Sequence, residues 1–197
     1  LYDGGAISNF GFLTVTDSTF EGNRAQMEED GSHVADTSDM GGGAIGIGSG
    51  SHVSIAGSTF VGNISGKDGG AIATRKFYGS YDTDSPDVSL SIRNSTFSGN
   101  EAGRSVSGDP YNYNNNVTGL YESGKEFDNG VGGAVYAYTG TLATDADSSV
   151  VITGSSFTGN SAAHGGAVAS RAQLEVRDSV FMGNTAAGWG GAIVNWK

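Results

Sequence analysis

Hydrophobic and polar residues alternate in short runs that recur along this chain. The most regular runs lead into a six-residue phrase, S-x-F-x-G-N. In every copy, leucine, isoleucine or valine stands seven and five positions before the phenylalanine. An apolar period of two predicts a β-strand with one buried face. The five copies of the phrase lie at residues 18–23, 58–63, 95–100, 155–160 and 179–184.

A second phrase, GGA followed by isoleucine or valine, alternates with the first. Two of its copies start only 25 residues apart, at Gly165 and Gly190, and the wider spacings are interpreted as the same unit with insertions. A unit of this length that recurs along a chain is typical of stacked repeats. The six copies lie at residues 4–7, 42–45, 69–72, 132–135, 165–168 and 190–193.

The two phrases together predict an all-β fold. No segment sustains the ~3.6-residue apolar period of a helix, and pairs of glycines oppose helix formation. Parallel strands that return within one short unit, with the same residue in the same place each time, describe a parallel β-helix. This is a solenoid, here of about five to six coils spaced ~4.8 Å apart. We expect one domain over residues 1–197, with side-loop insertions at about 26–40, 75–87, 103–131 and 139–148.

Stacked coils bring equivalent residues together as ladders. The phenylalanines are expected to stack in the core, and the glycine after each one is expected to adopt a positive φ at a corner. The asparagine can then turn inward and bond to backbone groups of the neighbouring coils. The predicted ladders consist of Phe20, Phe60, Phe97, Phe157 and Phe181, and of Asn23, Asn63, Asn100, Asn160 and Asn184.

Composition narrows the classes of partner. The chain has 34 glycines but only 2 prolines, which excludes collagen. Its 10 basic and 21 acidic residues give a formal net charge of −11, so nucleic acid is not expected as a partner. There is no cysteine, and because no apolar run approaches the ~18 residues of a membrane span, membrane insertion is not expected. The chain starts at Leu1 without a signal peptide, which predicts a mature product or a fragment whose targeting segments lie elsewhere.

The paired GGA[IV] and F-x-x-N phrases resemble the repeats of the chlamydial polymorphic outer membrane proteins, and related repeats of large bacterial and algal surface proteins. The resemblance covers nearly the whole chain, with six copies of one phrase and five of the other. It implies a right-handed β-helix displayed outside the cell, typically as an adhesin passenger or a surface fibre. It implies no reaction.

The sequence shows no catalytic constellation, and we predict that the protein is not an enzyme. Parallel β-helices also carry polysaccharide-active enzymes, but glycoside hydrolysis needs two carboxylates at a defined separation, and the acidic residues here gather in the insertions. A lyase would need calcium-binding carboxylates beside a basic residue, and one such arrangement places Arg75 and Lys76 before Asp82. A polysaccharide-active enzyme therefore remains the lesser alternative.

One insertion contains a candidate cation site. In YDTDSPD, the residues Asp82, Asp84 and Asp87 have the spacing of ligands for a hard cation such as Ca²⁺. The loop lacks the glycine and the distal glutamate of an EF-hand, and the same residues are common in plain turns, which is the alternative interpretation. No other cofactor is indicated.

Three N-x-[ST] sequons are potential glycosylation sites. Asn63 belongs to the inward asparagine ladder, where a glycan would contradict the predicted fold, so Asn94 and Asn116 are the candidates. Asn116 lies in the insertion 103–131, whose tyrosines suit binding to glycans or a surface receptor. A polar loop packed against the side of the solenoid is the alternative.

The predicted function is that of an extracellular structural protein. Neither end of the sequence shows the capping element that soluble solenoids usually carry, and uncapped strand edges pair with further strands. We therefore expect copies to stack head to tail into a filament or fibre at the cell surface. The alternative is an excised piece of a longer β-helix, an adhesin or autotransporter-type passenger that binds a host or surface ligand. The expected polymer interface consists of Gly4, Gly5, Ala6 and Ile7 at one end and Gly191, Ala192, Ile193 and Trp196 at the other.

Overall fold

The structure is a computed structural model that describes residues 3–25, 41–66, 68–74, 87–103, 130–137 and 148–196. Within these ranges the regular elements are the strands β1 to β23. All of their pairings are parallel, which confirms the predicted all-β parallel β-helix. The insertions predicted at 26–40, 75–87, 103–131 and 139–148 lie wholly or mainly outside the described residues.

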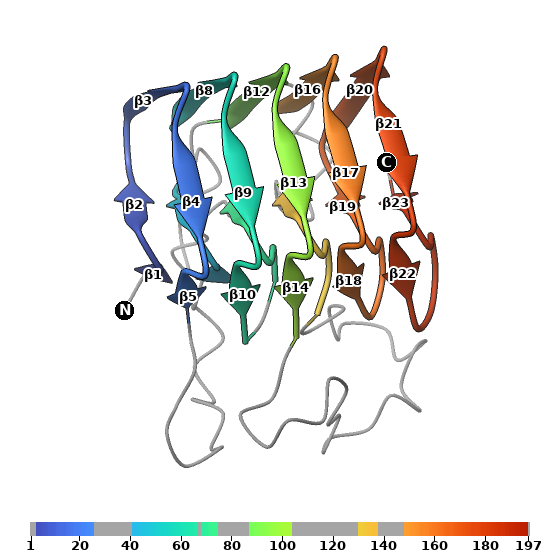
Figure 1. Ribbon diagram of the computed structural model, residues 1–197. Helices are drawn as coiled ribbons and strands as arrows, with labels where there is room; N and C mark the ends of the chain where they lie inside the picture. The colour runs from blue at the N-terminus through green and yellow to red at the C-terminus, as the bar shows by residue number, and fades with distance from the viewer. Residues whose placement is uncertain are drawn as a thin grey trace, which may run out of the picture.

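Successive coils contribute equivalent strands to each wall of the solenoid (Figure 1). The first coil comprises β1 (Asp3–Gly4), β2 (Ile7–Asn9), β3 (Phe12–Thr16), β4 (Thr19–Glu21) and β5 (Arg24–Ala25). The second comprises β6 (Gly41–Gly42), β7 (Ile45–Ile47), β8 (His52–Ala56), β9 (Thr59–Val61) and β10 (Ile64–Ser65). The third comprises β11 (Ile72–Thr74), β12 (Ser89–Arg93), β13 (Thr96–Ser98) and β14 (Glu101–Ala102). The fourth comprises β15 (Val135–Ala137), β16 (Ser149–Thr153), β17 (Ser156–Thr158) and β18 (Ser161–Ala162). The fifth comprises β19 (Val168–Ser170), β20 (Gln173–Arg177), β21 (Val180–Met182) and β22 (Thr185–Ala186). β23 (Ile193–Asn195) begins a sixth coil.

Among the described residues, four sheets form the walls, and a fifth of two strands pairs β1 with β6. The strands that follow GGA[IV] make a six-stranded sheet, here called the GGA sheet, in the order β2-β7-β11-β15-β19-β23. The other three walls have five strands each, in the orders β20-β16-β12-β8-β3, β21-β17-β13-β9-β4 and β22-β18-β14-β10-β5. In Figure 1 the chain descends along β4, β9 and β13 on the near side and returns on the far side as it advances toward the C-terminus, so the solenoid is right-handed.

The core lies inside the solenoid and follows from the alternation seen in the sequence. In β12, for example, Leu90 and Ile92 are buried while Arg93 is exposed. The phenylalanine rings form one continuous stack, and those of Phe60 and Phe97 lie 4.7 Å apart with an interplanar angle of 1°. Burial of one such side chain contributes about 1.5–3 kcal/mol, so the stack is a large part of what holds successive coils together.

Two kinds of glycine make the corners possible. The glycine after each phenylalanine has a positive φ, for example 58° at Gly62 and 59° at Gly99, a region that costs other residues about 1–2 kcal/mol. The second glycine of GGA[IV] is needed for space, because a Cβ on Gly70 would collide with the carbonyl oxygen of Gly133 in the next coil. Both phrases therefore recur because every coil turns the same corners at the same distance from its neighbours.

A further corner, between the strand before the phenylalanine and the phenylalanine strand, alternates from coil to coil. We call this set of residues the alternating corner: Asp17, Gly57, Asn94, Gly154 and Asp178. All five have a positive φ, from 46° at Asp17 to 60° at Gly154. Oδ1 of Asp17 lies over Gly57, and Oδ1 of Asn94 lies over Gly154, where a Cβ would collide with it. A side chain that leans over the next coil is thus followed by a glycine that leaves room for it.

Candidate functional site

The candidate functional site is the pair of end faces of the solenoid, and a hydrogen-bonded asparagine column gives these faces their polarity. Nδ2 of Asn63 donates to Oδ1 of Asn100 in the next coil (2.9 Å) and to the carbonyl oxygen of Phe20 in the preceding coil (3.0 Å). The backbone N–H of Asn63 also donates to Oδ1 of Asn100 (3.0 Å). The same three bonds recur from Asn100 and from Asn160. Every Oδ1 in the interior of the column therefore accepts from the coil before it, and every backbone N–H donates to the coil after it.

A serine column and the corner backbone have the same direction. The backbone N–H of Ser58 donates to Oγ of Ser95, and that of Ser95 donates to Oγ of Ser155, both at 3.2 Å. At the next corner, the N–H of Gly62 donates to the carbonyl oxygen of Ser98 (2.9 Å). The stack is thus a repeated, one-way pattern of donors and acceptors rather than a symmetric one.

The outermost coils carry the open ends of the asparagine column. On the N-terminal face, formed by β2, β3, β4 and β5, Asn23 donates to Asn63, and no described residue donates to Oδ1 of Asn23. On the C-terminal face, formed by β20, β21, β22 and β23, Nδ2 of Asn184 donates to the carbonyl oxygen of Phe157 (2.9 Å) and its Oδ1 accepts from Asn160. Within the described ranges, no asparagine of a further coil accepts a hydrogen bond from the backbone N–H of Asn184. One face therefore ends in an acceptor and the other in a donor.

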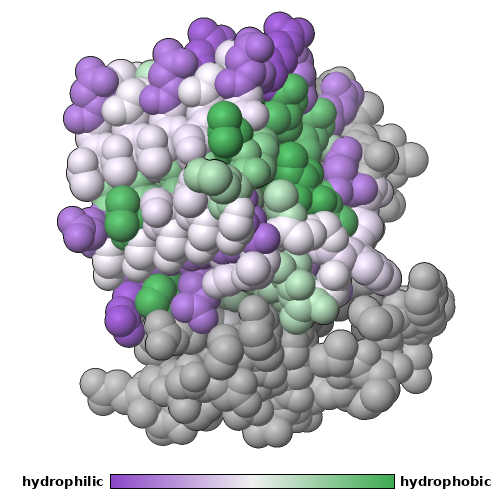
Figure 2. All heavy atoms as spheres, turned by 45° about the vertical axis from the view of Figure 1, so that its right-hand side comes forward, coloured by the Kyte–Doolittle hydropathy of each residue, from purple (hydrophilic) through white to green (hydrophobic). Residues whose placement is uncertain are grey.

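Hydrophobic side chains at both faces are less buried than their equivalents inside the rod. The three central phenylalanines are fully buried, whereas Phe20 and Phe181 are partly exposed. At the C-terminal face, Leu174, Val176 and Ile193 are also only partly buried against the core. Figure 2 shows hydrophobic side chains gathered at this end of the molecule. Each face thus combines open strand edges with an apolar centre.

The two faces end at different places around the coil. The GGA sheet has six strands and the other three walls have five, since β23 begins a sixth coil that the described residues do not continue. The C-terminal face is therefore stepped, with β23 one strand spacing, ~4.8 Å, beyond the level of β20, β21 and β22. On the N-terminal face, β2 belongs to the same coil as β3, β4 and β5.

The interface residues predicted from the sequence lie at the two edges of the GGA sheet. Ile7 in β2 pairs with Ile45, and Ile193 in β23 pairs with Val168. The residues Gly4, Gly5, Ala6, Gly191 and Ala192 form the corners that precede these two strands. Trp196 follows β23 and packs against the side of the rod, with its ring 5.8 Å from the guanidinium carbon of Arg171.

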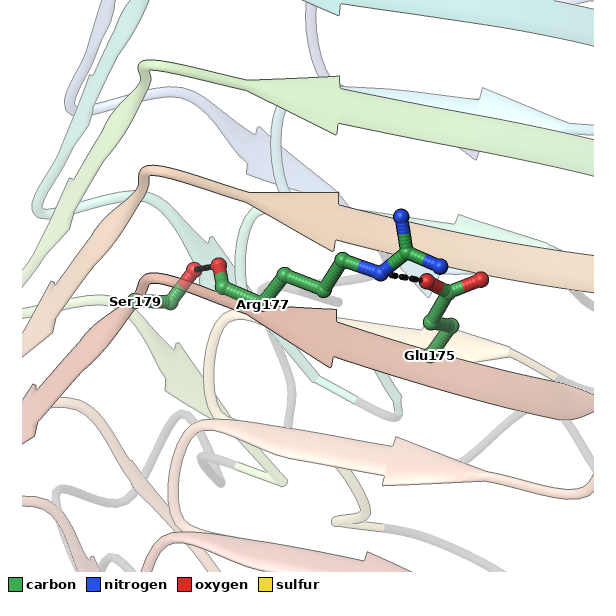
Figure 3. A network of polar contacts seen from close by, with 3 residues as sticks. All are labelled: Glu175, Arg177 and Ser179. Carbon is green, nitrogen blue, oxygen red and sulfur yellow. Dashed lines mark hydrogen bonds and ion pairs between the residues drawn. The ribbon is translucent and has the colours of Figure 1, made fainter.

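Charged residues line one edge of the C-terminal face. Glu175 and Arg177 stand two residues apart on β20, point to the same side and form an ion pair (Figure 3). Oγ of Ser179 donates to the carbonyl oxygen of Arg177 (2.7 Å). Asp178 lies exposed at the alternating corner between them, as Asp17 does on the N-terminal face. Because Glu175 and Arg177 neutralise each other, Asp178 gives this edge its negative charge.

A cluster at the last two GGA[IV] corners was not predicted. Nδ1 of His164 accepts a hydrogen bond from the backbone N–H of Trp189 (2.9 Å), and the two rings lie 5.2 Å apart. The ring of Trp196 meets the same imidazole edge-on at 6.5 Å. Burial lowers the pKa of His164, which favours the neutral imidazole. The N–H of Trp189 then selects the tautomer in which Nδ1 carries no proton and accepts. The sequence signal for this contact is that both His164 and Trp189 directly precede a glycine pair.

The candidate cation and lyase site falls almost entirely outside the described residues, to which Arg75, Lys76, Asp82 and Asp84 do not belong. Asp87 is described, and its Oδ1 accepts a hydrogen bond from Oγ of Ser148 (3.1 Å). Across the described ranges, no three histidine, aspartate or glutamate side chains come together in a group suited to a metal ion. The same ranges contain no helix of the length and apolarity that would let it span a bilayer.

The sequons differ in their surroundings. Asn63 is fully buried in the asparagine column, where no glycan has room. Asn94 is exposed at the alternating corner with a φ of 48°. Asn116 lies outside the described residues. Asn94 and Asn116 thus stay as predicted glycosylation sites.

Comparison with known proteins identifies the repeat. The family model of the Chlamydia polymorphic membrane protein repeat matches residues 57–75 and 178–195. Each match runs from the alternating corner, through the phenylalanine and asparagine, to a strand of the GGA sheet. No curated protein and no solved structure matches the chain. The match supports, in general terms, a location at the cell surface. The chain therefore carries, at these two places, the repeat of the Chlamydia polymorphic membrane proteins.

Proposed function

We propose that this protein is a structural element of a cell surface and that its β-helices stack head to tail into a filament. The observation that carries the proposal is the polarity of the asparagine column, which ends in an acceptor, Oδ1 of Asn23, and in a donor, the N–H of Asn184. A second copy on the C-terminal face presents Asn23 where the next asparagine of the column would stand. The two ends of one chain complement each other.

The backbone hydrogen bonds can continue across such a junction in the same register. Inside the rod, each residue of the alternating corner donates its N–H to the following coil, as Gly154 does to the carbonyl oxygen of Arg177 (3.1 Å). At the junction, Asp178 takes the role of Gly154, and Thr16 of the next copy takes the role of Arg177. The serine column continues in the same way. The open edges of β20, β21 and β22 then gain partners in β3, β4 and β5 of the next copy.

Stacking also buries the apolar centres of the faces. Phe20 of the next copy would lie on Phe181 as Phe181 lies on Phe157, with ring centroids 4.8 Å apart. Complete burial of a large apolar side chain contributes about 1.5–3 kcal/mol, but the interface has the width of one coil and association costs translational and rotational freedom. We therefore expect assembly that depends strongly on protein concentration.

A second candidate function is that of a surface passenger that displays a binding site, as an adhesin does. The match of residues 57–75 and 178–195 to a membrane protein repeat favours it. In this case the solenoid is a spacer, and we expect the host or surface ligand to bind at the insertion 103–131.

The test of the filament is the size of the full 197-residue chain as a function of concentration, by sedimentation velocity and negative-stain electron microscopy. We expect fibres that lengthen with concentration, with an axial repeat of roughly 25 Å for five coils. Leu174→Lys places an ammonium group in the apolar centre of the C-terminal face, where it reaches water in a single copy and is buried in a stack. This variant should stay monomeric.

The matched control is Met182→Lys, which adds the same charge on the side of the rod, where Met182 is 61% exposed. This variant should form fibres as the wild type does. Thermal melts of both variants establish that the fold is retained. Short isolated rods at every concentration of the wild-type chain would show that the filament proposal is wrong and would favour the surface passenger.

A further inference from the structure

The stepped C-terminal face makes two registers of stacking mutually exclusive. If β23 of one copy pairs with β2 of the next, the GGA sheet continues. The strands β20, β21 and β22 then stand two strand spacings, about 10 Å, from β3, β4 and β5, with nothing between them. If β3, β4 and β5 instead pair with β20, β21 and β22, three walls close without a gap. In that register β23 and the next copy's β2 fall on the same position in the GGA sheet. The reason is that each copy contributes six strands to the GGA sheet but only five to each of the other three walls.

The two strands that compete for this position are nearly the same sequence. Residues 4–10 read GGAISNF and residues 190–196 read GGAIVNW. Of the six GGA[IV] copies, these two are the pair that continues with asparagine followed by an aromatic residue. Ile193 and Asn195 thus repeat Ile7 and Asn9 of the first strand, and Val194 stands where the first strand has Ser8.

We propose that copies join by strand replacement, in which β23 of one copy takes the position of β2 in the next copy, between its own β19 and the next copy's β7. This inference rests on the proposed head-to-tail assembly and specifies its junction. In this register the asparagine, serine and phenylalanine columns run through the junction without a break, which end-on pairing of β23 with β2 does not allow.

The replacing strand fits its position from both sides. It keeps its pairing with β19, in which Ile193 stands opposite Val168. On its open side, Ile193 takes the place that Ile7 holds opposite Ile45. An isoleucine therefore meets an isoleucine in the core of the junction.

The replaced strand is held from one side. β2 has three residues and pairs with β7 alone, on the edge of the GGA sheet. Replacement also opens the pairing of β1 with β6 and the bonds from the N–H groups of residues 5–7 to the carbonyl oxygens of Gly42 and Ala44, and the arriving residues 190–193 carry the same GGAI sequence. Ile7 and Asn9 are only partly buried, and Phe10, which follows, is 57% exposed. A Cβ at Gly11 would meet no atom within 4 Å, so the chain has room to turn there. β3 keeps its own pairing with β8 when β2 leaves.

Two substitutions in the full chain separate strand replacement from end-on pairing. Ile7→Lys weakens the hold of β2 and leaves the arriving β23 unchanged, so replacement predicts fibres at the same or a lower protein concentration than the wild type needs. Ile193→Lys weakens β23 and should raise that concentration by about tenfold or more. Met182→Lys is again the control for added charge. If both substitutions raise the protein concentration needed for fibres equally, the filament proposal holds and strand replacement is wrong. A wild-type chain that stays monomeric would contradict both proposals.

Engineered disulfides give a readout that does not depend on strand stability. The chain has no cysteine, and strand replacement places Val194 beside Gly46 of the next copy at a Cα separation of roughly 4.8 Å, within disulfide range. In one copy these residues lie on β23 and β7, with β11, β15 and β19 between them. The double variant Val194→Cys, Gly46→Cys should therefore form a covalent ladder of multimers on oxidation. Val194→Cys, Ser8→Cys, which end-on pairing would link, should not; the reverse pattern, or no ladder from either variant, contradicts the proposal.

Discussion

At the scale of the residue, one asparagine per coil closes a corner that the backbone leaves open. Its amide has both a donor and an acceptor, so Asn100 accepts from Asn63 with Oδ1 and donates to Phe60 and Asn160 with Nδ2. Aspartate lacks the donor, and alanine lacks both groups. The period of the sequence predicts an inward asparagine that bonds to neighbouring coils, but the direct bonds between successive asparagines become visible only when the coils are stacked.

Asn100→Ala should lower the free energy of unfolding by about 2–4 kcal/mol, because it leaves the buried N–H of Asn63 and the carbonyl oxygen of Phe60 without their partner. Denaturant unfolding followed by circular dichroism measures the loss. The matched control is Asn184→Ala in the outermost coil, where water replaces the lost bonds and a loss of about 1 kcal/mol is expected. Equal losses at the two positions would show that burial of the column does not set its contribution.

At the scale of the element, a side chain joins the turns that precede two pairs of neighbouring GGA[IV] strands, in addition to the backbone bonds between the coils. Oδ1 of Asp68 accepts from the N–H of Val131 (3.1 Å), as Nδ1 of His164 accepts from Trp189. The position before the glycine pair therefore acts as a capping position for the next coil. Aspartate and histidine both serve, but only histidine loses its acceptor near neutral pH.

Stability should fall as the pH drops below about 6.5, the usual pKa of histidine. Burial lowers the pKa of His164 in the folded chain, so over this range the unfolded chain takes up a proton that the folded chain does not. The contribution of His164 is thus complete above about pH 6.5 and is lost as the pH falls through its folded pKa, at up to about 1.4 kcal/mol per pH unit.

Chemical unfolding between pH 7.5 and 5.5, followed by tryptophan fluorescence, measures this dependence. His164→Gln keeps an acceptor but does not titrate, so its unfolding should depend less on pH than that of the wild type. His52→Gln removes a histidine whose ring is solvent-exposed and bonds to Ser89 (2.8 Å), and it should retain the wild-type dependence. If His164→Gln and the wild type respond alike to acid, the link does not control stability.

At the scale of the whole molecule, the distribution of charge opposes the proposed head-to-tail assembly. The chain has a net charge of −11, so copies repel one another at low ionic strength. The alternating corner adds a local term, because a stacked junction places Asp178 over Asp17, where the interior of the rod has glycine after each aspartate or asparagine. In the proposed filament the Asp178 carboxyl group would have to turn away from the Cβ of Asp17, and two carboxylates one strand spacing apart would oppose the junction.

Asp178→Asn should lower the protein concentration needed for assembly by about three- to tenfold at low salt, since it removes one of two facing charges. Asparagine keeps the positive φ of this corner, as Asn94 does in the third coil. The advantage should shrink above physiological salt, where charges are screened. Sedimentation at several salt concentrations measures both effects. Asp87→Asn removes the same charge away from the faces and should change assembly much less; a similar gain from both variants would assign the effect to net charge alone.

The sequence by itself determined the solenoid, its unit, the stacked phenylalanines and the glycine corners. In a parallel in-register stack each residue meets its own equivalent in the next coil, so a period along the chain is also a contact pattern in space. For that reason GGA[IV] and S-x-F-x-G-N were enough to predict the fold and the recognised repeat.

Only the tertiary structure decided which coil lies at which level. The alternation of Asp17 with Gly57, the contact of His164 with Trp189 and the step at β23 each depend on how coils of unequal length are placed above one another. None of these follows from the repeat, because the repeat treats all coils as equal. The cation ligands Asp82 and Asp84 and the sequon at Asn116 lie in insertions outside the described residues, where the repeat makes no prediction of contacts.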